Sequence, residues 1–217
     1  MNQKVTLVLT EFIGTALLLA IVTGSGIMGD TLSAGNAAVA LLGNSIATGC
    51  GLYVLITLLA PISGAHFNPV VSIMFWSEGK LSLSALFNYV TAQFLGAISG
   101  VWLVHMMFTL PLIQISTKPR VGFGIWLSEL TATLILLTVI RLGVKYASDK
   151  VPMLVALTVT AGYWFTSSTF FSNPAVTVAR SLTNTFVGIQ PADVGVFISA
   201  QIVAVLLMLI IMKVNFK

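Results

Sequence analysis

The sequence of 217 residues has little charge: only 7% of its residues are Asp, Glu, Lys or Arg, whereas 57% are hydrophobic. Soluble domains carry about 25% charged residues, so this chain cannot cover a surface that faces water. A single cysteine, Cys50, excludes a disulfide within the chain and a paired-cysteine metal site. The net charge of +4 is small and the basic residues are scattered, so we expect no nucleic-acid partner. The composition predicts a protein whose partners are membrane lipids.

Clusters of residues that carry out chemistry are also missing from the sequence. The two histidines, His66 and His105, lie far apart and form no metal-ligand pair. We find no pairing of a nucleophile with a base and no phosphate-binding loop. We therefore expect no metal, no cofactor and no enzymatic activity.

Apolar runs long enough to cross a bilayer occur six times. A spanning helix needs roughly 20 mostly apolar residues, and such runs lie near residues 5–28, 36–60, 82–108, 123–146, 153–170 and 193–213. Two shorter stretches, about 68–77 and 174–184, follow Asn-Pro pairs and are too short to cross. The first run contains Glu11 and lacks a small-residue cleavage site, so we interpret it as a retained helix and not as a signal peptide. The prediction is an all-α membrane protein with six transmembrane helices and two re-entrant half-helices.

The second half of the chain repeats the order of motifs in the first half. Each half has a Glu in its first span, an Asn-Pro pair before its half-helix and a Gln in its third span. These residues are Glu11, Asn68 and Gln93 in the first half and Glu129, Asn173 and Gln201 in the second. Because each half has three spans, the second copy enters the membrane from the opposite side, which makes an inverted repeat. We expect one channel domain over residues 1–217, with halves of about 1–110 and 120–217.

The basic residues predict the orientation of the chain. With both termini in the cytoplasm, the basic residues on the inner side are Lys4, Lys80, Arg141, Lys145, Lys150, Lys213 and Lys217. Those on the outer side are Lys118, Arg120 and Arg180. This excess of positive charge on the inner side predicts that both termini are cytoplasmic.

Asn68 and Asn173 each precede a proline at the start of a helix-compatible stretch, a pattern that predicts a helix N-terminus. The inverted repeat brings these two residues together near the middle of the membrane. The loops before them supply backbone carbonyls, and their amides supply donors, for a neutral hydroxylated solute. Each half-helix also directs the positive end of its dipole at the centre, which repels cations. We predict a pore with the two asparagines at its central constriction; helix capping alone is the alternative.

Glu11 and Glu129 are carboxylates inside the membrane, which makes them functional candidates. One interpretation is a proton relay. The other is that each carboxylate accepts backbone N–H bonds from the broken loop of its own half and holds that loop in place. The sequence offers no obvious intramembrane proton partner, so we favour loop support.

Two further polar residues flank the Asn-Pro motifs. His66 precedes Asn68 in the re-entrant loop, and we expect it to line the cytoplasmic half of the pore. Arg180 follows Asn173 by seven residues and shares a helical face with Val176. Arg180 is either a surface or subunit-contact residue or, with its side chain leaning toward the helix N-terminus, a source of positive charge in the outer vestibule.

The segments 63–70 and 172–175 closely resemble the paired signature of the aquaporin (major intrinsic protein) family, and the Glu and Gln residues fall where that family's pattern expects them. The resemblance covers the whole chain. It implies the aquaporin fold, a homotetramer with one pore per subunit, and passive passage of water or small neutral solutes. Val70 and Ala175, which follow the two Asn-Pro pairs, are then expected either to line the pore beside the asparagines or to support its loops.

Departures from the family pattern bear on the solute. In most of the family an arginine follows the second motif at once and gives the selectivity filter its charge, whereas here that position is Val176. The resemblance places the other filter positions at Thr48, at Ala161 or its neighbour Gly162, and at Phe170. Because Thr48 and Ala161 replace bulky members of the water-specific pattern, we expect a wide and largely apolar filter.

The segment 173–180 is similar to bacterial aquaglyceroporins associated with arsenic-resistance genes, which also lack the filter arginine. That resemblance implies a channel of the bacterial inner membrane that passes arsenite as neutral arsenous acid. Glycerol fits the same size and polarity, and the residues alone do not name the solute. One alternative is a water-selective aquaporin, in which Phe170 and its neighbours close the filter. The other is an ion-coupled secondary transporter, because inverted repeats with broken helices occur there too.

Overall fold

The computed structural model describes the backbone of residues 3–215 and the side chains of residues 3–211. Lys217 and the side chain of Lys213, which entered the prediction of orientation, lie outside the described residues. The long helices are α1 (Gln3–Leu32), α2 (Ala37–Ser63), α4 (Leu83–Met107), α5 (Phe123–Tyr146), α6 (Val151–Phe165) and α8 (Pro191–Asn215). The short elements are α3 (Pro69–Ser77), η1 (Ser148–Lys150) and α7 (Pro174–Arg180).

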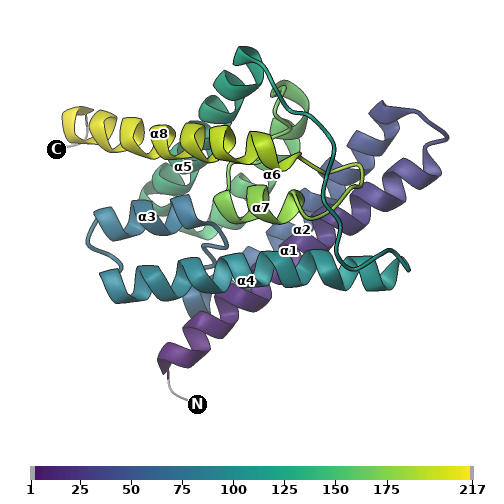
Figure 1. Cartoon of the computed structure of the whole chain (residues 1–217). Helices are drawn as coiled ribbons and strands as arrows, with labels where there is room; N and C mark the ends of the chain where they lie inside the picture. Colours follow the sequence, from purple (N-terminus) through teal and green to yellow (C-terminus); the bar gives the residue numbers. More distant parts are fainter. Residues whose placement is uncertain (1–2, 216–217) are drawn as a thin grey trace.

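The helices form two halves, α1–α4 and α5–α8, that pack together around the short helices α3 and α7 (Figure 1). In the first half α1 packs against α2 and α4, and in the second half α5 packs against α6 and α8. Helices α2 and α6 join the halves. Each half-helix also contacts a long helix of the other half, α3 with α8 and α7 with α4. The predicted fold with two re-entrant half-helices is confirmed.

The described residues distribute polarity in the way that a lipid environment requires. Leu58, Phe87 and Leu157 expose 60% or more of their surface, whereas Glu11 and Glu129 are fully buried. Soluble proteins show the opposite distribution, because their carboxylates are almost never fully buried whereas their large apolar side chains usually are. Five helices, α1, α2, α4, α5 and α8, are long and apolar enough to cross a membrane.

Helix α6 is shorter than the sequence suggested. It has 15 residues and is therefore about 22 Å long. The predicted apolar run 153–170 is wrong at its C-terminal end, because the helix ends at Phe165 and the chain turns into the second re-entrant loop. The hydroxyl of Thr166 donates to the carbonyl of Gly162 at 2.6 Å, a local bond that competes with helix continuation.

Glycines allow α1 and α4 to pack with their backbones in close contact. A Cβ atom added to Gly100 would lie 2.1 Å from the carbonyl oxygen of Ala16, and one added to Gly96 would lie 2.3 Å from that of Phe12. Such close approach through small residues is typical of helix pairs in membranes. Counted from Gln93 and Gln201, the second half has Ala204 and Met208 at the positions of these two glycines.

Candidate pore

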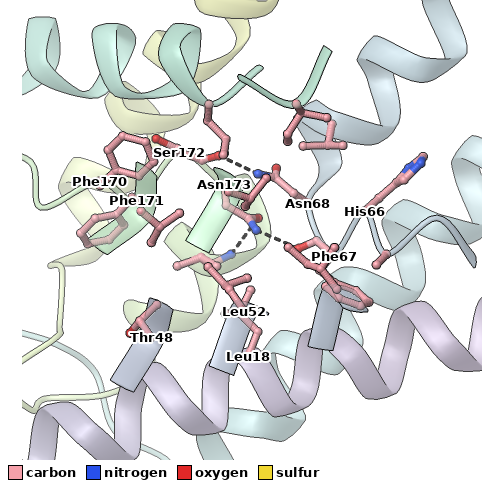
Figure 2. Close-up of a pocket in the computed structure, with 18 of the residues that line it drawn as sticks. Leu18, Thr48, Leu52, His66, Phe67, Asn68, Phe170, Phe171, Ser172 and Asn173 are labelled. Carbon is pink, nitrogen blue, oxygen red and sulfur yellow. Dashed lines mark hydrogen bonds between the residues drawn. The ribbon is translucent and has the colours of Figure 1, made fainter. Parts of the chain in front are cut away.

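Asn68 and Asn173 begin the two half-helices and face each other at the centre of the protein (Figure 2). Their side-chain oxygens cap the helices: Asn68 Oδ1 accepts from the N–H of Val70 at 3.1 Å, and Asn173 Oδ1 accepts from the N–H groups of Ala175 and Val176 at 3.0 and 3.2 Å. The predicted N-termini are therefore present, with proline at the first helical position of each.

The same asparagines also connect the two halves. The amide nitrogen of Asn68 donates to the carbonyl of Ser172 at 2.7 Å, and that of Asn173 donates to the carbonyl of Phe67 at 2.8 Å (Figure 2). A side-chain amide carries two N–H donors, so one donor of each asparagine is used in this exchange and one is left. Both residues line the central cavity, where the second donor is available to a solute.

The two re-entrant loops, residues 64–68 and 166–173, have matching backbones. Positive φ angles occur four, three and one residue before each asparagine. They are 88°, 50° and 49° at Gly64, Ala65 and Phe67, and 59°, 54° and 45° at Thr169, Phe170 and Ser172. Most of these residues are not glycine, and non-glycine residues pay about 1–3 kcal/mol for such conformations, which persist where their surroundings enforce them.

In the first half, the carboxylate of Glu11 enforces the loop conformation. Its Oε1 accepts from the hydroxyl of Ser63 at 2.7 Å and from the N–H of His66 at 3.0 Å. Its Oε2 accepts from the N–H of Phe67 and from the amide of Gln93, both at 2.8 Å. All four donors belong to the loop or to the helices that flank it, so the carboxylate acts as a fixed acceptor for the first re-entrant loop.

In the second half, Glu129 holds the loop through fewer contacts. Its Oε1 accepts from the N–H of Ser172 and from the amide of Gln201, the latter at 2.7 Å. Its Oε2 has no hydrogen-bond partner among the described residues, and the hydroxyl of Ser168 lies near without reaching hydrogen-bond geometry. Neither Glu11 nor Glu129 lines the cavity. These contacts are those expected for loop support and not for a proton relay.

A cavity of about 110 Å³ lies beside the asparagines, with walls from α1, α2, α5, α6, the half-helices α3 and α7, and both re-entrant loops. Most of its wall is apolar, as in the residues Leu52, Ile56, Leu136, Ile140, Val155 and Val159. Polar groups are few and come mainly from the loops and the asparagines. An apolar passage with a small number of placed donors and acceptors is suited to a neutral solute that sheds part of its water.

Three of the four expected filter residues line this cavity. Thr48, Phe170 and Val176 lie in its wall. Ala161 does not: its side chain is exposed on α6, away from the cavity. Tyr163 occupies the corresponding wall, with its hydroxyl 3.3 Å from Thr48 Oγ1.

The expectation for Ala161 is wrong because the rotation of α6 was not known. The residues of α6 that face the cavity are Val151, Val155, Val159 and Tyr163, spaced by four. Gly162, the neighbour that was also considered, packs behind Phe170, where an added Cβ would lie 2.1 Å from the phenyl ring. The filter is therefore bulkier on this side than the sequence suggested.

The remaining predicted residues divide between the cavity wall and its support. His66 lines the cavity on the side of the asparagines opposite Thr48 and Phe170 (Figure 2). Its ring stacks on Phe75 with centroids 4.7 Å apart, and its Nδ1 lies 3.0 Å from the hydroxyl of Ser72. Val70 and Ala175 are fully buried but do not line the cavity. Of the two expected roles, pore lining and loop support, pore lining is wrong for both residues. They lie behind the asparagines, to which they donate backbone N–H groups.

Arg180 lies in the cavity wall and is only 2% exposed, so the interpretation as a surface residue is wrong. Its Nε donates to the carbonyl of Val187, and its guanidinium carbon lies 3.4 Å from the centroid of the Phe171 ring. Helix α7 ends at this residue, four positions earlier than predicted, and the following turn folds back over the guanidinium.

Arg120 is a residue that sequence reasoning missed. It lies in the connection between α4 and α5, donates from Nε to the carbonyl of Gly188 at 2.9 Å, and has its guanidinium carbon 4.8 Å from the same Phe171 ring. Burial lowers the pKa of Arg120 to about 10, so the side chain stays cationic at neutral pH. No local motif marks this residue, because it is brought to the site by a long irregular connection.

Comparison with known proteins identifies the family. The profile described as "Major intrinsic protein" matches residues 2–212. The chain is 49% identical over 203 residues to "Aquaglyceroporin AqpS" of Rhizobium meliloti (strain 1021), a match that covers 94% of this chain and 87% of that protein. It is 39% identical over 116 residues to "Glycerol uptake facilitator protein" of Pseudomonas aeruginosa, covering 54% of this chain and 40% of that protein.

A solved structure has the same fold. The X-ray structure of the aquaglyceroporin from Plasmodium falciparum superposes with a TM-score of 0.77 at 23% identity, covering 98% of this chain and 96% of that chain. At this identity the likeness bears on the fold alone. Together with the paired half-helices and the family profile, it leads to one conclusion: the chain belongs to the major intrinsic protein family.

Proposed function

We propose that the protein is a passive membrane channel for small neutral solutes: glycerol-like polyols, metalloid acids such as arsenite, and water. The observation that carries the proposal is the cavity that passes both asparagines, with apolar walls and unused amide donors. A neutral hydroxylated solute fits such a passage because it can exchange water for a few hydrogen bonds without leaving a charge unsolvated. The names of the two bacterial relatives, an aquaglyceroporin and a glycerol facilitator, support the same solute class.

The selectivity filter that we propose consists of Thr48, Tyr163, Phe170 and Val176. The valine removes a long cationic side chain from the wall, which favours larger solutes. Glu11 and Glu129 support the two loops, and the asparagines contact the solute. In this proposal the channel is a single domain that operates without a cofactor or a reaction step.

The experiment that tests the proposal is a panel of solutes in one reconstituted preparation. Stopped-flow light scattering on proteoliposomes would compare water, glycerol, urea and arsenite, with empty liposomes as the control. We expect glycerol and arsenite flux that is linear in concentration and insensitive to a proton or sodium gradient. Flux that saturates at low solute concentration and needs such a gradient would favour the ion-coupled alternative.

A water-selective channel is the second candidate, and Tyr163 is the observation that favours it. Its ring and that of Phe170 add bulk to the outer part of the cavity, beyond what the sequence predicted. Water permeability without glycerol or arsenite flux would establish this candidate and refute the first. Val176→Arg separates the two further: in a wide channel it should reduce glycerol flux roughly tenfold more than water flux.

We also propose a homotetramer in the bacterial inner membrane with both termini in the cytoplasm. The family resemblance supports the assembly, and the distribution of Lys and Arg supports the orientation. Light scattering of the detergent-solubilised protein should give four chains per particle. A C-terminal alkaline phosphatase fusion should be inactive, and a C-terminal fluorescent-protein fusion should be bright.

A further inference from the structure

Arg180 is buried, yet part of its guanidinium makes no hydrogen bond, and leaving a buried charged donor unpaired is energetically costly. The side chain is 98% buried, and in the described part of the chain its guanidinium makes one hydrogen bond, from Nε to Val187. Its two terminal amino groups have no hydrogen-bond partner among the described residues, and neither group is completely enclosed. Arg180 lines the cavity, which is therefore the space open to a partner for these groups. A buried cation with unpaired donors at a passage points to a ligand.

The guanidinium is held in a fixed position. Phe171 supports it at 3.4 Å, and the ring is itself packed edge-on against Phe197 with centroids 5.1 Å apart. The carbonyl of Val187 fixes the Nε edge. The contact with Phe171 and the hydrogen bond to Val187 restrict rotation of the guanidinium. Its two terminal amino groups are therefore held in a fixed orientation.

The charge of Arg180 is not cancelled by direct contact. No carboxylate among the described residues forms an ion pair with Arg180 within 4 Å. Tyr163 and Glu129 act electrostatically on Arg180 without touching it, and one carboxylate oxygen of Glu129 is engaged by Ser172 and Gln201. Arg120 adds a second positive charge near the same ring. Arg120 is partly exposed, and the buried carboxylate of Asp193 accepts from its backbone N–H at 2.6 Å. Arg180 is thus the buried cation of the cavity wall.

We propose that Arg180 is a specificity-determining residue of the outer cavity, which repels cations and donates a pair of hydrogen bonds to oxygen-rich neutral solutes. The side chain of Val176 has no hydrogen-bond donor. Arg180, one turn later on the same face of α7, supplies a donor to the cavity wall. The ligand class is a solute with two adjacent oxygen acceptors, such as a vicinal diol or a neutral oxyacid, because a guanidinium presents parallel N–H groups. This inference rests on the proposed channel function.

The test uses the full-length protein in proteoliposomes, with four variants compared to the wild type. Arg180→Met removes charge and donors, Arg180→Lys keeps the charge and removes the paired geometry, and Val176→Arg with Arg180→Met returns a cation to the wall. Lys145→Met, which removes an exposed positive charge on α5 outside the cavity wall, is the matched control. The readouts are potassium leak and the ratio of glycerol to urea permeability.

We expect Arg180→Met to raise potassium leak roughly tenfold, because a unit charge beside a low-dielectric passage sets a barrier of that order. The ratio of glycerol to urea permeability should fall several-fold, because urea has a single oxygen acceptor. Arg180→Lys should keep the low leak and lose part of the ratio, the double variant should return the leak to the wild-type level, and Lys145→Met should behave as the wild type.

The inference is overturned if Arg180→Met and Arg180→Lys both keep the wild-type leak and the wild-type ratio while glycerol still passes. If Arg180→Met does not assemble, Arg180→Lys decides: an unchanged ratio refutes the paired donor. Absence of glycerol flux in the wild-type protein itself would instead refute the proposed function, so the two failures are distinct.

Discussion

The two re-entrant loops have the same backbone but are held in different ways. In the first half four donors converge on Glu11, and every oxygen of its carboxylate is used. In the second half Glu129 receives two donors on one oxygen, and the other oxygen is unpaired among the described residues. The same asparagine geometry is therefore achieved with a densely bonded loop on one side and a sparsely bonded loop on the other.

The lengths of the preceding helices explain this difference. Helix α2 continues to Ser63, five positions before Asn68, and brings the Ser63 hydroxyl onto the carboxylate. Helix α6 ends at Phe165, eight positions before Asn173, so the matching Ser168 lies in the loop and does not bond to Glu129. The longer second loop carries Phe170 and Phe171 into the cavity wall instead. Phe170, which we propose as a filter residue, therefore lies on the side where the loop has fewer supporting hydrogen bonds.

The two mouths of the cavity differ in a related way. In each half, the residue two positions before the asparagine packs against the residue seven positions after it. The first pair is His66 with Phe75, and the second is Phe171 with Arg180. The first pair places a histidine on a phenyl ring, whereas the second places a permanent cation there. The two halves of the inverted repeat thus have a ring contact at matching positions, but only the second contact includes a permanent charge.

The largest effect is expected when the two carboxylates are removed one at a time. Each buried donor left unpaired costs about 1–3 kcal/mol, and Glu11→Ala leaves four donors where Glu129→Ala leaves two. We expect Glu11→Ala to lower stability by at least about 2 kcal/mol more than Glu129→Ala, measured by thermal unfolding in detergent. Glu→Gln at each position, which keeps one acceptor, is the control. Equal losses would show that the bonding difference between the loops has no energetic weight.

An intermediate effect is expected from glycines in the two halves. Gly100→Ala places a methyl group against the Ala16 carbonyl, and overpacking of this kind costs about 1–3 kcal/mol. Gly195→Ala, on α8 of the second half, has nothing within 4 Å of the added carbon and should be neutral or slightly stabilising. Thermal unfolding of both variants measures the contrast. A stable Gly100→Ala protein would mean that α1 and α4 can separate without cost.

The smallest effect is expected from the asparagines, where the halves are most alike. Loss of an N-cap costs about 1 kcal/mol. Asn173 caps two N–H groups and Asn68 caps one, so Asn173→Ala should be the more destabilising by a fraction of that amount. A double-mutant cycle with both alanines would measure the coupling between the halves. A coupling energy of zero would contradict the reciprocal bonds across the centre.

Much of this arrangement could be predicted from the sequence because it depends on local rules. Asn-Pro specifies a capped helix start whatever surrounds it, and a Glu within an apolar run needs donors that only a broken loop can supply. The repeated order of Glu, Asn-Pro and Gln then determines which segments meet. These rules placed Asn68, Asn173, Glu11 and Glu129 in the positions that the structure gives them.

What could not be predicted depends on helix rotation and on long connections. Ala161 was placed by counting along a helix, and a shift of two residues on α6 moves a side chain from the lipid face to the cavity, where Tyr163 lies. The sequence did not decide between a surface position and a vestibule position for Arg180, because the orientation of its side chain depends on the turn that follows α7. Arg120 reaches the site through a connection with no periodicity.

The reciprocal hydrogen bonds of the two asparagines make the central constriction depend on both halves of the chain. The amides of Asn68 and Asn173 reach carbonyls that are more than a hundred residues away along the chain. Without the second half, the amide of Asn68 and the carbonyl of Phe67 would lack these partners. The central constriction is therefore built by both halves together, and neither half contains it alone.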